Sequence, residues 1–335
     1  MKIDHQNQTQ HSYQPRPPRS ASWLAALLLA TPAVALATGQ ETNAPPSQPA
    51  AEVKPEKGPP LPLHEIEGNG GIFSTLSAYI VNPPRNGELV GRPSLGFAFV
   101  DLGHGQNLEA LTLTESPWKR LELGFGWDNL DLGDLPPAIK EATGVRISRQ
   151  DVELYNANAR FQVLKEGEFD QKWIPALTLG GHLKWNDGIK EINDELADAL
   201  GKSGIKHHDG ADFTLYASKL FTQLPRPVLL ELGGRATESV WNGLGGFTDS
   251  YSFLFEGNVV VFVTSNIALA AEYRQQADGY KPIGSLVKAA GDWITVDAAY
   301  VVNPHLTLAA GYGHFGGLLN HDADGVLGLT IKYEF

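Results

Sequence analysis

The chain has 335 residues and a formal net charge of −12, from 26 basic and 38 acidic side chains. This charge disfavours a nucleic-acid partner, which requires a basic surface. Cysteine is absent, which excludes disulfides, thiolate metal sites and catalysis by a cysteine.

Residues 1–37 have the order of features found in a secretory signal peptide. A polar stretch with Arg16 and Arg19 precedes the apolar run WLAALLLATPAVALA, which ends in a small-x-small sequence at Ala37. The run is short for a membrane-spanning helix, and Pro32 interrupts it. We therefore expect export with cleavage near Ala37, and an uncleaved membrane anchor is the alternative.

Residues 38–69 are predicted to form a disordered periplasmic linker. Most of them lie in TGQETNAPPSQPAAEVKPEKGPPLPLHEI, a stretch rich in Pro, Ala, Gln and Glu that cannot bury enough apolar surface to fold. The next stretch, 72–81, has Ser and Thr on both faces. It is either an extra strand or a segment lying inside a barrel.

Residues 70–335 are dominated by segments in which apolar and polar residues alternate. In SYSFLFEGN, for example, Tyr251 and Phe253 lie on one face, and Ser252 and Glu256 lie on the other. This period of two predicts β-strands. We expect about twelve of them, beginning near Ser94, Leu108, Arg120, Asp151, Trp173, Asp212, Val228, Ser250, Ile267, Trp293, His305 and Val326.

The connectors between the predicted strands are of two kinds. SPWK, QLPRP, TSN and VNPH are short, whereas 128–150, 187–211, 239–249, 277–291 and 315–325 are long. Short periplasmic turns and long external loops are typical of outer-membrane barrels. We therefore predict a transmembrane antiparallel up-and-down β-barrel of about 12 strands, within a range of 12–14, and a soluble β-sandwich is the alternative.

The stretch GLTIKYEF fits a strand of such a barrel. Leu329, Ile331, Tyr333 and Phe335 share one apolar face. An apolar face that meets lipid, with aromatic rings near the strand ends, suits a bilayer interface. Tyr333 and Phe335 also look like the recognition signal that the barrel-assembly machinery reads during insertion.

Several stretches between residues 78 and 335 are similar to one known family. They are AYIVNPPRNGELVGRPSLGFAFVDLGHG, DFTLYASKLFTQLPRPVLLELGGRATES, EGNVVVFVT, LAAEYRQ and AAYVVNPHLTLAAGYGHFGGLLNHDADGVLGLTIKYEF. They resemble a family of proteobacterial outer-membrane β-barrel proteins catalogued as a domain of unknown function. The resemblance implies an outer-membrane location in a Gram-negative envelope and a barrel fold over roughly 70–335, and it transfers no catalytic residues.

The strand alternation places ten charged side chains on the inward face, five of each sign. They could line a pore, or they could pair across the wall and fill a narrow lumen. They are Glu122, Arg160, Lys184, Glu231, Arg235, Glu256, Glu272, Arg274, Asp297 and Lys332.

No pattern in the sequence predicts catalysis, a cofactor or a metal site. There is no G-x-S-x-G elbow, and loop carboxylates such as Asp131 and Asp322 lack the spacing of a calcium loop. We expect a porin-like passive channel for small hydrophilic solutes, in contact with outer-membrane lipid and lipopolysaccharide. The alternative is a closed barrel with a structural or envelope-assembly role and no transport.

Overall fold

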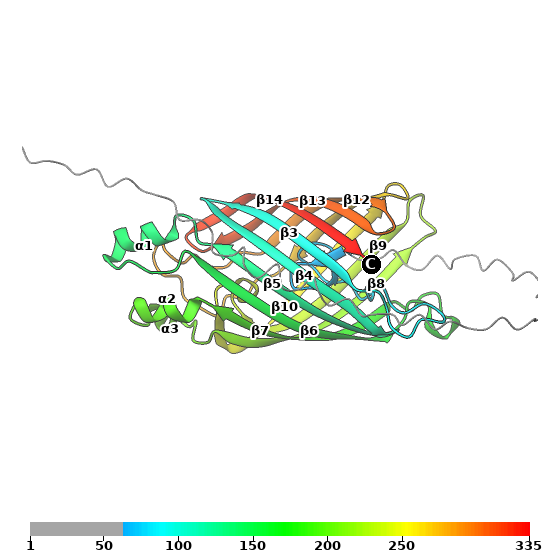
Figure 1. Ribbon diagram of the computed structural model, residues 1–335, viewed down its shortest axis with the longest axis horizontal. Helices are drawn as coiled ribbons and strands as arrows, with labels where there is room; N and C mark the ends of the chain where they lie inside the picture. Colours follow the sequence, from blue (N-terminus) through cyan, green and yellow to red (C-terminus); the bar gives the residue numbers. More distant parts are fainter. Residues whose placement is uncertain (1–62) are drawn as a thin grey trace, which may run out of the picture. The chain divides into compact units, whose positions relative to one another are not determined.

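The computed structural model describes residues 63–335, so the predicted signal peptide and most of the predicted linker lie outside the described residues. Twelve antiparallel strands close into an up-and-down barrel (Figure 1). Each strand pairs with the next along the chain, and β14 pairs with β3 to complete the ring. The strands are β3 (Ser94–Gly103), β4 (Gln106–Trp118), β5 (Leu121–Asp131), β6 (Asp151–Leu164), β7 (Ala176–Asp187), β8 (Asp209–Phe221), β9 (Val228–Ser239), β10 (Phe247–Phe262), β11 (Ile267–Arg274), β12 (Trp293–Asn303), β13 (Leu306–Leu318) and β14 (His321–Glu334).

The predicted alternation sets the two faces of the wall. On β14, Leu329 and Ile331 are 53% and 47% exposed on the outside, whereas Thr330 and Lys332 between them are buried. A sandwich would bury the apolar faces between two sheets and leave the polar faces in water. The barrel does the reverse, so the sandwich alternative is wrong and the predicted barrel of 12 strands is confirmed.

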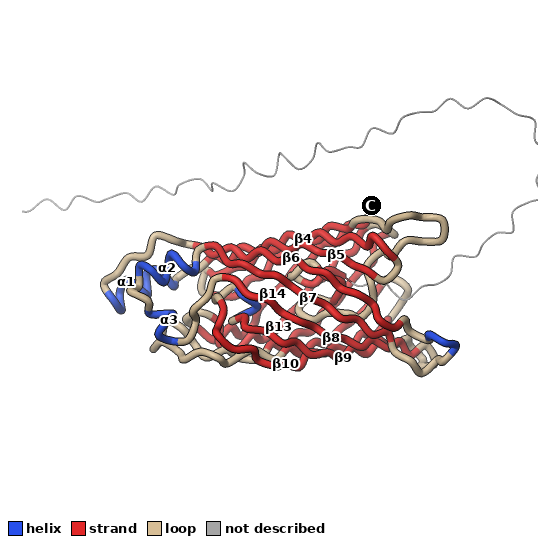
Figure 2. The backbone as a smooth tube through the Cα atoms, turned by 90° about the horizontal axis from the view of Figure 1, so that it is seen from below, coloured by secondary structure: helices blue, strands red, loops and turns tan. Residues whose placement is uncertain are grey.

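The two ends of the barrel differ. Helices α1 (Leu135–Thr143), α2 (Ile189–Glu195) and α3 (Ala199–Ser203) gather at one end, which we call the long-loop end (Figure 2). Short connectors and the 3₁₀ turn η2 (Glu168–Asp170) lie at the other, the short-turn end. None of the helices within residues 63–335 has the length and apolar character needed to cross a membrane.

One predicted long loop is a strand hairpin instead. Residues 315–325 were expected to form a loop, but β13 and β14 continue to a tight turn between Leu318 and His321. Phe315, Leu318 and Ala323 are buried and belong to the apolar cluster at this end. This apolar packing explains why the hairpin continues where glycine and aspartate in the sequence favour a turn.

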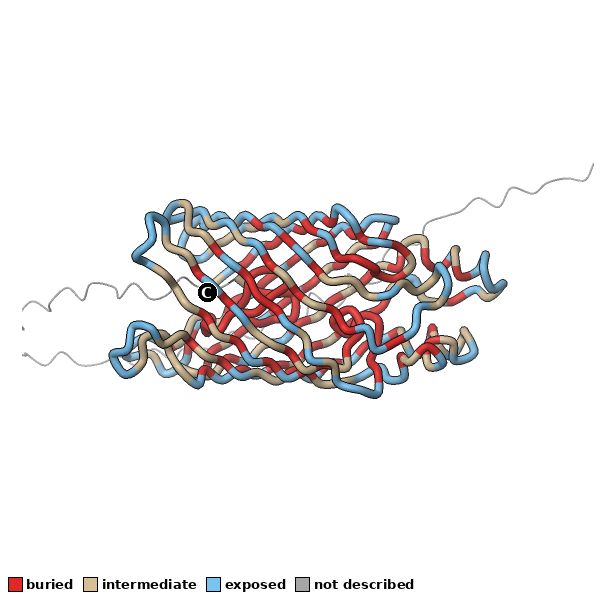
Figure 3. The backbone as a smooth tube through the Cα atoms, turned by 180° about the vertical axis from the view of Figure 1, so that it is seen from behind, coloured by how far each residue is buried: buried red, intermediate tan, exposed pale blue. Residues whose placement is uncertain are grey.

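The chain before the first barrel strand lies inside the barrel. Strands β1 (Leu63–Glu65) and β2 (Asn69–Gly71) form a small hairpin, and every residue from His64 to Val81 is buried. In Figure 3, segments coloured as buried are visible inside the barrel, enclosed by its wall. We call residues 63–82 the plug. The stretch 72–81 is therefore a segment inside the barrel, and the expected boundary between linker and barrel falls within β2.

Candidate functional site: the plug and the lumen wall

The ten charged residues predicted to face inward are all buried. None is more than 8% exposed, although they come from eight different strands. They are Glu122 on β5, Arg160 on β6, Lys184 on β7, Glu231 and Arg235 on β9, Glu256 on β10, Glu272 and Arg274 on β11, Asp297 on β12 and Lys332 on β14.

Glu67 of the plug is the centre of an ionic cluster. Its Oε1 lies 2.5 Å from Nζ of Lys184, and its Oε2 lies 2.6 Å from Nη2 of Arg235. Nη2 of Arg274 is 3.5 Å from Oε2. Burial disfavours the charged carboxylate, but these three cations outweigh it and hold the pKa of Glu67 well below its usual range. The plug is thus anchored by a carboxylate that stays ionised.

Wall carboxylates complete this cluster. Asp212 on β8 lies 2.6 Å from Lys184 Nζ and 2.9 Å from Arg235 Nη1, and Glu256 accepts a hydrogen bond of 2.7 Å from Arg235 Nε. Each cation therefore keeps a partner on the wall as well as one on the plug. Asp212 thus has a central role in the cluster, which its position near the start of a predicted strand does not indicate.

A second anchor of the plug is Glu272 on β11, which binds the backbone of the plug as well as one side chain. The carboxylate of Glu272 accepts hydrogen bonds from the consecutive backbone N–H groups of Phe73, Ser74 and Thr75, the last at 2.8 Å. Thr75 Oγ1 also donates to it, at 2.5 Å. Successive N–H groups that converge on one anion form a strong binding geometry, because the charge strengthens every bond.

A third anchor holds the last part of the plug. Glu122 accepts hydrogen bonds from the backbone N–H groups of Gly70 and Val81, at 3.0 and 2.8 Å. Arg160 donates from Nε to Glu122 at 2.9 Å and from Nη1 to the carbonyl of Ser77 at 2.5 Å. Gly70 and Val81 are thereby fixed to the same wall carboxylate, and Arg160 binds both that carboxylate and the plug backbone between them.

Glycines in the wall allow the plug to approach it closely. A Cβ atom at Gly124 would lie 2.0 Å from the carbonyl oxygen of Gly68, and one at Gly126 would lie 2.9 Å from the carbonyl of Glu67. Both distances are shorter than any tolerable contact. Glycine at these two inward positions is therefore required by the neighbouring backbone of the plug.

The first strand of the plug is also bound through a neutral histidine. His64 makes hydrogen bonds to Ser94 Oγ at 2.5 Å and Thr112 Oγ1 at 2.9 Å. Burial, with Lys332 and Arg160 nearby, lowers the pKa of His64 well below its usual value. Uncharged imidazole can both donate and accept, which matches the two hydroxyl partners.

The long-loop end of the lumen is closed by the connection between β9 and β10. Its 3₁₀ turn η3 (Trp241–Gly243) enters the barrel, and Asn242 Oδ1 accepts hydrogen bonds from Lys184 at 2.9 Å and Arg274 at 2.6 Å. The same two cations contact Glu67 of the plug. The loop and the plug therefore share their partners on the wall.

The remaining predicted residues lie toward the short-turn end. Asp297 and Lys332 border a cavity of about 380 Å³ beside the plug, and Lys332 Nζ lies 2.6 Å from Glu334. Tyr333 and Phe335 are 45% and 52% exposed on the outer face, with ring centroids 5.2 Å apart.

The strand alternation predicts which charges face inward but gives no indication of their partners on the plug. His64, Glu65 and Glu67 fell within the predicted linker, because proline-rich composition dominates that stretch. The only local signal was the change to HEIEGNGG, in which two acidic residues precede glycines. Within residues 63–335, no group of three His, Asp or Glu side chains is arranged to hold a metal ion.

Comparison with known proteins gives the following relationships. No curated protein matches the chain. The KdgM porin has 9% sequence identity and a TM-score of 0.43, covering 72% of this chain and 99% of its own. The NanC porin has 10% identity and a TM-score of 0.41, covering 72% and 98%. An outer membrane channel from Pseudomonas putida F1 has 12% identity and a TM-score of 0.40, covering 72% and 94%.

The family relationship is carried by the barrel wall. Residues 94–329 match the family described as "Protein of unknown function (DUF3034)", a range that includes nearly all of the twelve wall strands and excludes the plug. The chain therefore belongs to this family of proteins of unknown function, DUF3034.

Proposed function

We propose that this protein is an outer-membrane channel of the porin type that its own residues 63–82 close. Small hydrophilic solutes pass when the plug shifts from its anchors, and no catalytic step is involved. The observation that carries this proposal is the nature of the contacts across the lumen. The plug is held by ion pairs and hydrogen bonds to charged wall residues.

The outer face supports the outer-membrane location. Large apolar side chains of the strands, such as Phe97, Leu183 and Val296, are exposed by 42%, 65% and 55%. A tilted strand needs about 9–11 residues to cross a bilayer, and most of the wall strands are at least this long. In this location the wall contacts lipid and lipopolysaccharide, and Tyr333 and Phe335 serve as the assembly signal.

Polar anchors are more typical of a movable plug than of a permanent core. When a polar segment leaves, water replaces its hydrogen bonds on both sides, so the net cost of each bond is modest. The plug also buries Ile72, Leu76 and Tyr79 in an apolar cluster with wall residues, and exposing these side chains adds to the free-energy cost of moving it. The cavity of about 380 Å³ at the short-turn end provides space into which the segment can shift.

A closed barrel with a structural role is the second candidate. The number of bonds on Glu272 and the burial of the Glu67 cluster favour it, because breaking a buried ion pair is costly. The two candidates differ in whether the intact protein ever conducts.

Single-channel recording in planar bilayers separates them. We expect the wild type to be mostly closed, with brief current steps, and Glu67→Gln to raise the open probability at least tenfold, because it weakens the ionic anchor. Asp128→Asn is the matched control, since it makes the same acid-to-amide change at a buried side chain that has no hydrogen-bond partner among the described residues. Silence of wild type and Glu67→Gln alike would support the structural role.

A further inference from the structure

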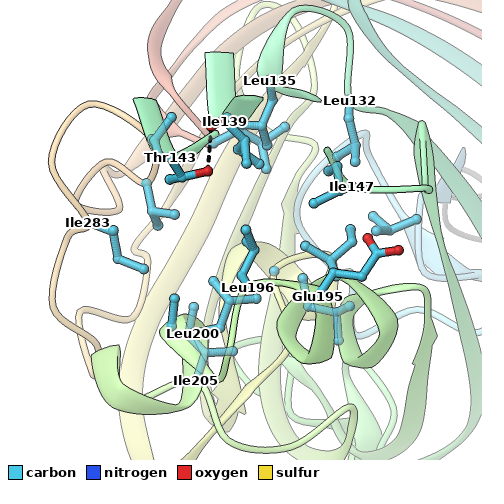
Figure 4. A pocket seen from close by; sticks show the side chains of 18 of the residues that line it. Leu132, Leu135, Ile139, Thr143, Ile147, Glu195, Leu196, Leu200, Ile205 and Ile283 are labelled. Carbon is cyan, nitrogen blue, oxygen red and sulfur yellow. Dashed lines mark hydrogen bonds between the residues drawn. The ribbon is translucent and has the colours of Figure 1, made fainter. Parts of the chain in front are cut away.

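A cavity separate from the lumen lies among the loops at the long-loop end. Its volume is about 200 Å³, and five different connections between strands line it (Figure 4). The connections contribute Ile139 from α1, Leu196 and Leu200 from the segment with α2 and α3, Trp241 from the β9–β10 loop, Ile283 from the β11–β12 loop and Leu319 from the β13–β14 turn.

The lining is almost entirely apolar. Thr143 and Glu195 are polar, but Thr143 Oγ1 donates to the carbonyl of Ile139 and Glu195 accepts from the backbone N–H of Ser148. The indole N–H of Trp241 donates to the carbonyl of Gly317. The Thr143 hydroxyl, one carboxylate oxygen of Glu195 and the Trp241 N–H are thus bonded within the protein, and the cavity surface offers a ligand mainly carbon atoms.

Such a cavity suits neither water nor a polar solute. A buried water needs two to four polar partners, which this lining does not provide. An apolar cavity of about 150 Å³ in another protein stays dry and binds benzene. A cavity of about 200 Å³ therefore accommodates one aromatic ring with a small substituent, or a short alkyl chain.

An apolar cavity is unusual at the end of a barrel, where this one lies. Connections at the end of a barrel are usually polar and face water, yet α1, α2 and α3 each bury apolar residues on this one space. Leu135 and Ile139 from one loop face Leu200 and Ile205 from another (Figure 4). Loops that only capped the barrel would pack these side chains against each other and leave no cavity of this size.

We infer that the long-loop end contains a binding site for a small uncharged apolar molecule, of the size of a substituted benzene or a short alkyl chain. The site is formed by the loops and does not require the plug to move. It adds to the proposed channel a capacity to bind hydrophobic compounds at the long-loop end of the barrel.

Trp241 allows binding to be measured directly. We would titrate the full chain, held in lipid nanodiscs, with bromobenzene, whose bromine quenches tryptophan fluorescence on contact. We expect a saturable quenching component in the wild type. Trp241→Phe should lose this component, whereas Trp173→Phe, which removes an exposed ring at the short-turn end, should keep it.

A second pair of variants tests the cavity itself. Ala199→Phe fills part of the space and should abolish the saturable component, and Ala142→Phe on the exposed side of α1 should retain it. Quenching that rises linearly, with equal slope in all variants, would show partition into lipid only and overturn the inference. Should Ala199→Phe fail to fold, crystals soaked in iodobenzene decide: an iodine peak among Ile139, Leu196 and Ile205 supports the site, and iodine found only on the lipid-facing wall contradicts it.

Discussion

At the residue scale, Glu67 is the plug side chain that contacts three cations of the wall, Lys184, Arg235 and Arg274. Replacing it by glutamine keeps the shape and removes the charge that faces Lys184 and Arg235. We expect a loss of about 3 kcal/mol in the free energy of unfolding, at the lower end for a broken buried ion pair because both cations keep Asp212. Urea unfolding of the barrel in lipid vesicles measures this difference.

Asp128 provides the matched comparison for that measurement. It is buried, and neither of its oxygens has a hydrogen-bond partner among the described residues. Asp128→Asn makes the same acid-to-amide change without breaking an ion pair or a hydrogen bond, so stability should be unchanged or slightly increased. Equal destabilisation by Glu67→Gln and Asp128→Asn would contradict a specific role for the Glu67 cluster.

Gly124 tests how closely the plug contacts the wall. Its substitution by alanine places a methyl group about 2.0 Å from the carbonyl oxygen of Gly68, and we expect overpacking to cost about 1–3 kcal/mol. Gly181→Ala is the control, because a Cβ there meets nothing within 4 Å. The melting temperatures of the two variants, compared with wild type, should therefore differ. Identical values would mean that the plug does not lie against β5.

The sequence predicts which side of the wall a residue faces much better than it predicts which residue it contacts. The alternation in β14 predicted that Lys332 faces inward and Ile331 outward, because a strand has a fixed period of two. No local pattern indicates that Arg235 contacts Glu67, 168 residues away along the chain. Such a contact depends on the closure of the barrel around a segment that is itself irregular.

At the element scale, the wall and the plug were not equally predictable. Wall strands carry their own hydrophobic pattern and pair with their neighbours along the chain. The apolar residues of the plug do not keep to one face with a period of two, since Ile72 and Phe73 are adjacent, as are Tyr79 and Ile80. Its order comes partly from groups that the wall supplies, such as Glu122 and Glu272. Composition alone therefore assigned its first residues to a linker.

The pairing of the wall strands does not depend on the plug, so deleting the plug tests whether it closes the lumen. All twelve wall strands find their pairing partners within 94–334, so a variant without residues 63–82 should still form a barrel. We expect it to show heat-modifiable migration on a mild-detergent gel and to let small sugars enter liposomes much faster than wild type does. A folded variant as impermeable as wild type would show that the loop containing η3 closes the lumen without the plug.

At the scale of the whole molecule, three layers follow one another along the barrel. A cavity lies at the short-turn end, the charged cluster of plug and wall lies in the middle, and the apolar loop cluster lies at the long-loop end. Asn242 connects the last two layers, because it contacts Lys184 and Arg274 while its neighbour Trp241 borders the apolar cavity. The plug and the η3 loop are therefore linked through the two cations that they share.

The central claim is that movement of the plug opens the lumen, and a reversible cross-link tests it most directly. Ser77 on the plug and Ser218 on the wall both donate to the same oxygen of Glu231, and the natural chain has no cysteine to interfere. We would record single-channel currents from Ser77→Cys/Ser218→Cys before and after reduction, with each single variant as control. Our account predicts no steps while the disulfide is formed and wild-type steps after dithiothreitol. Wild-type currents through the oxidised double variant would contradict it.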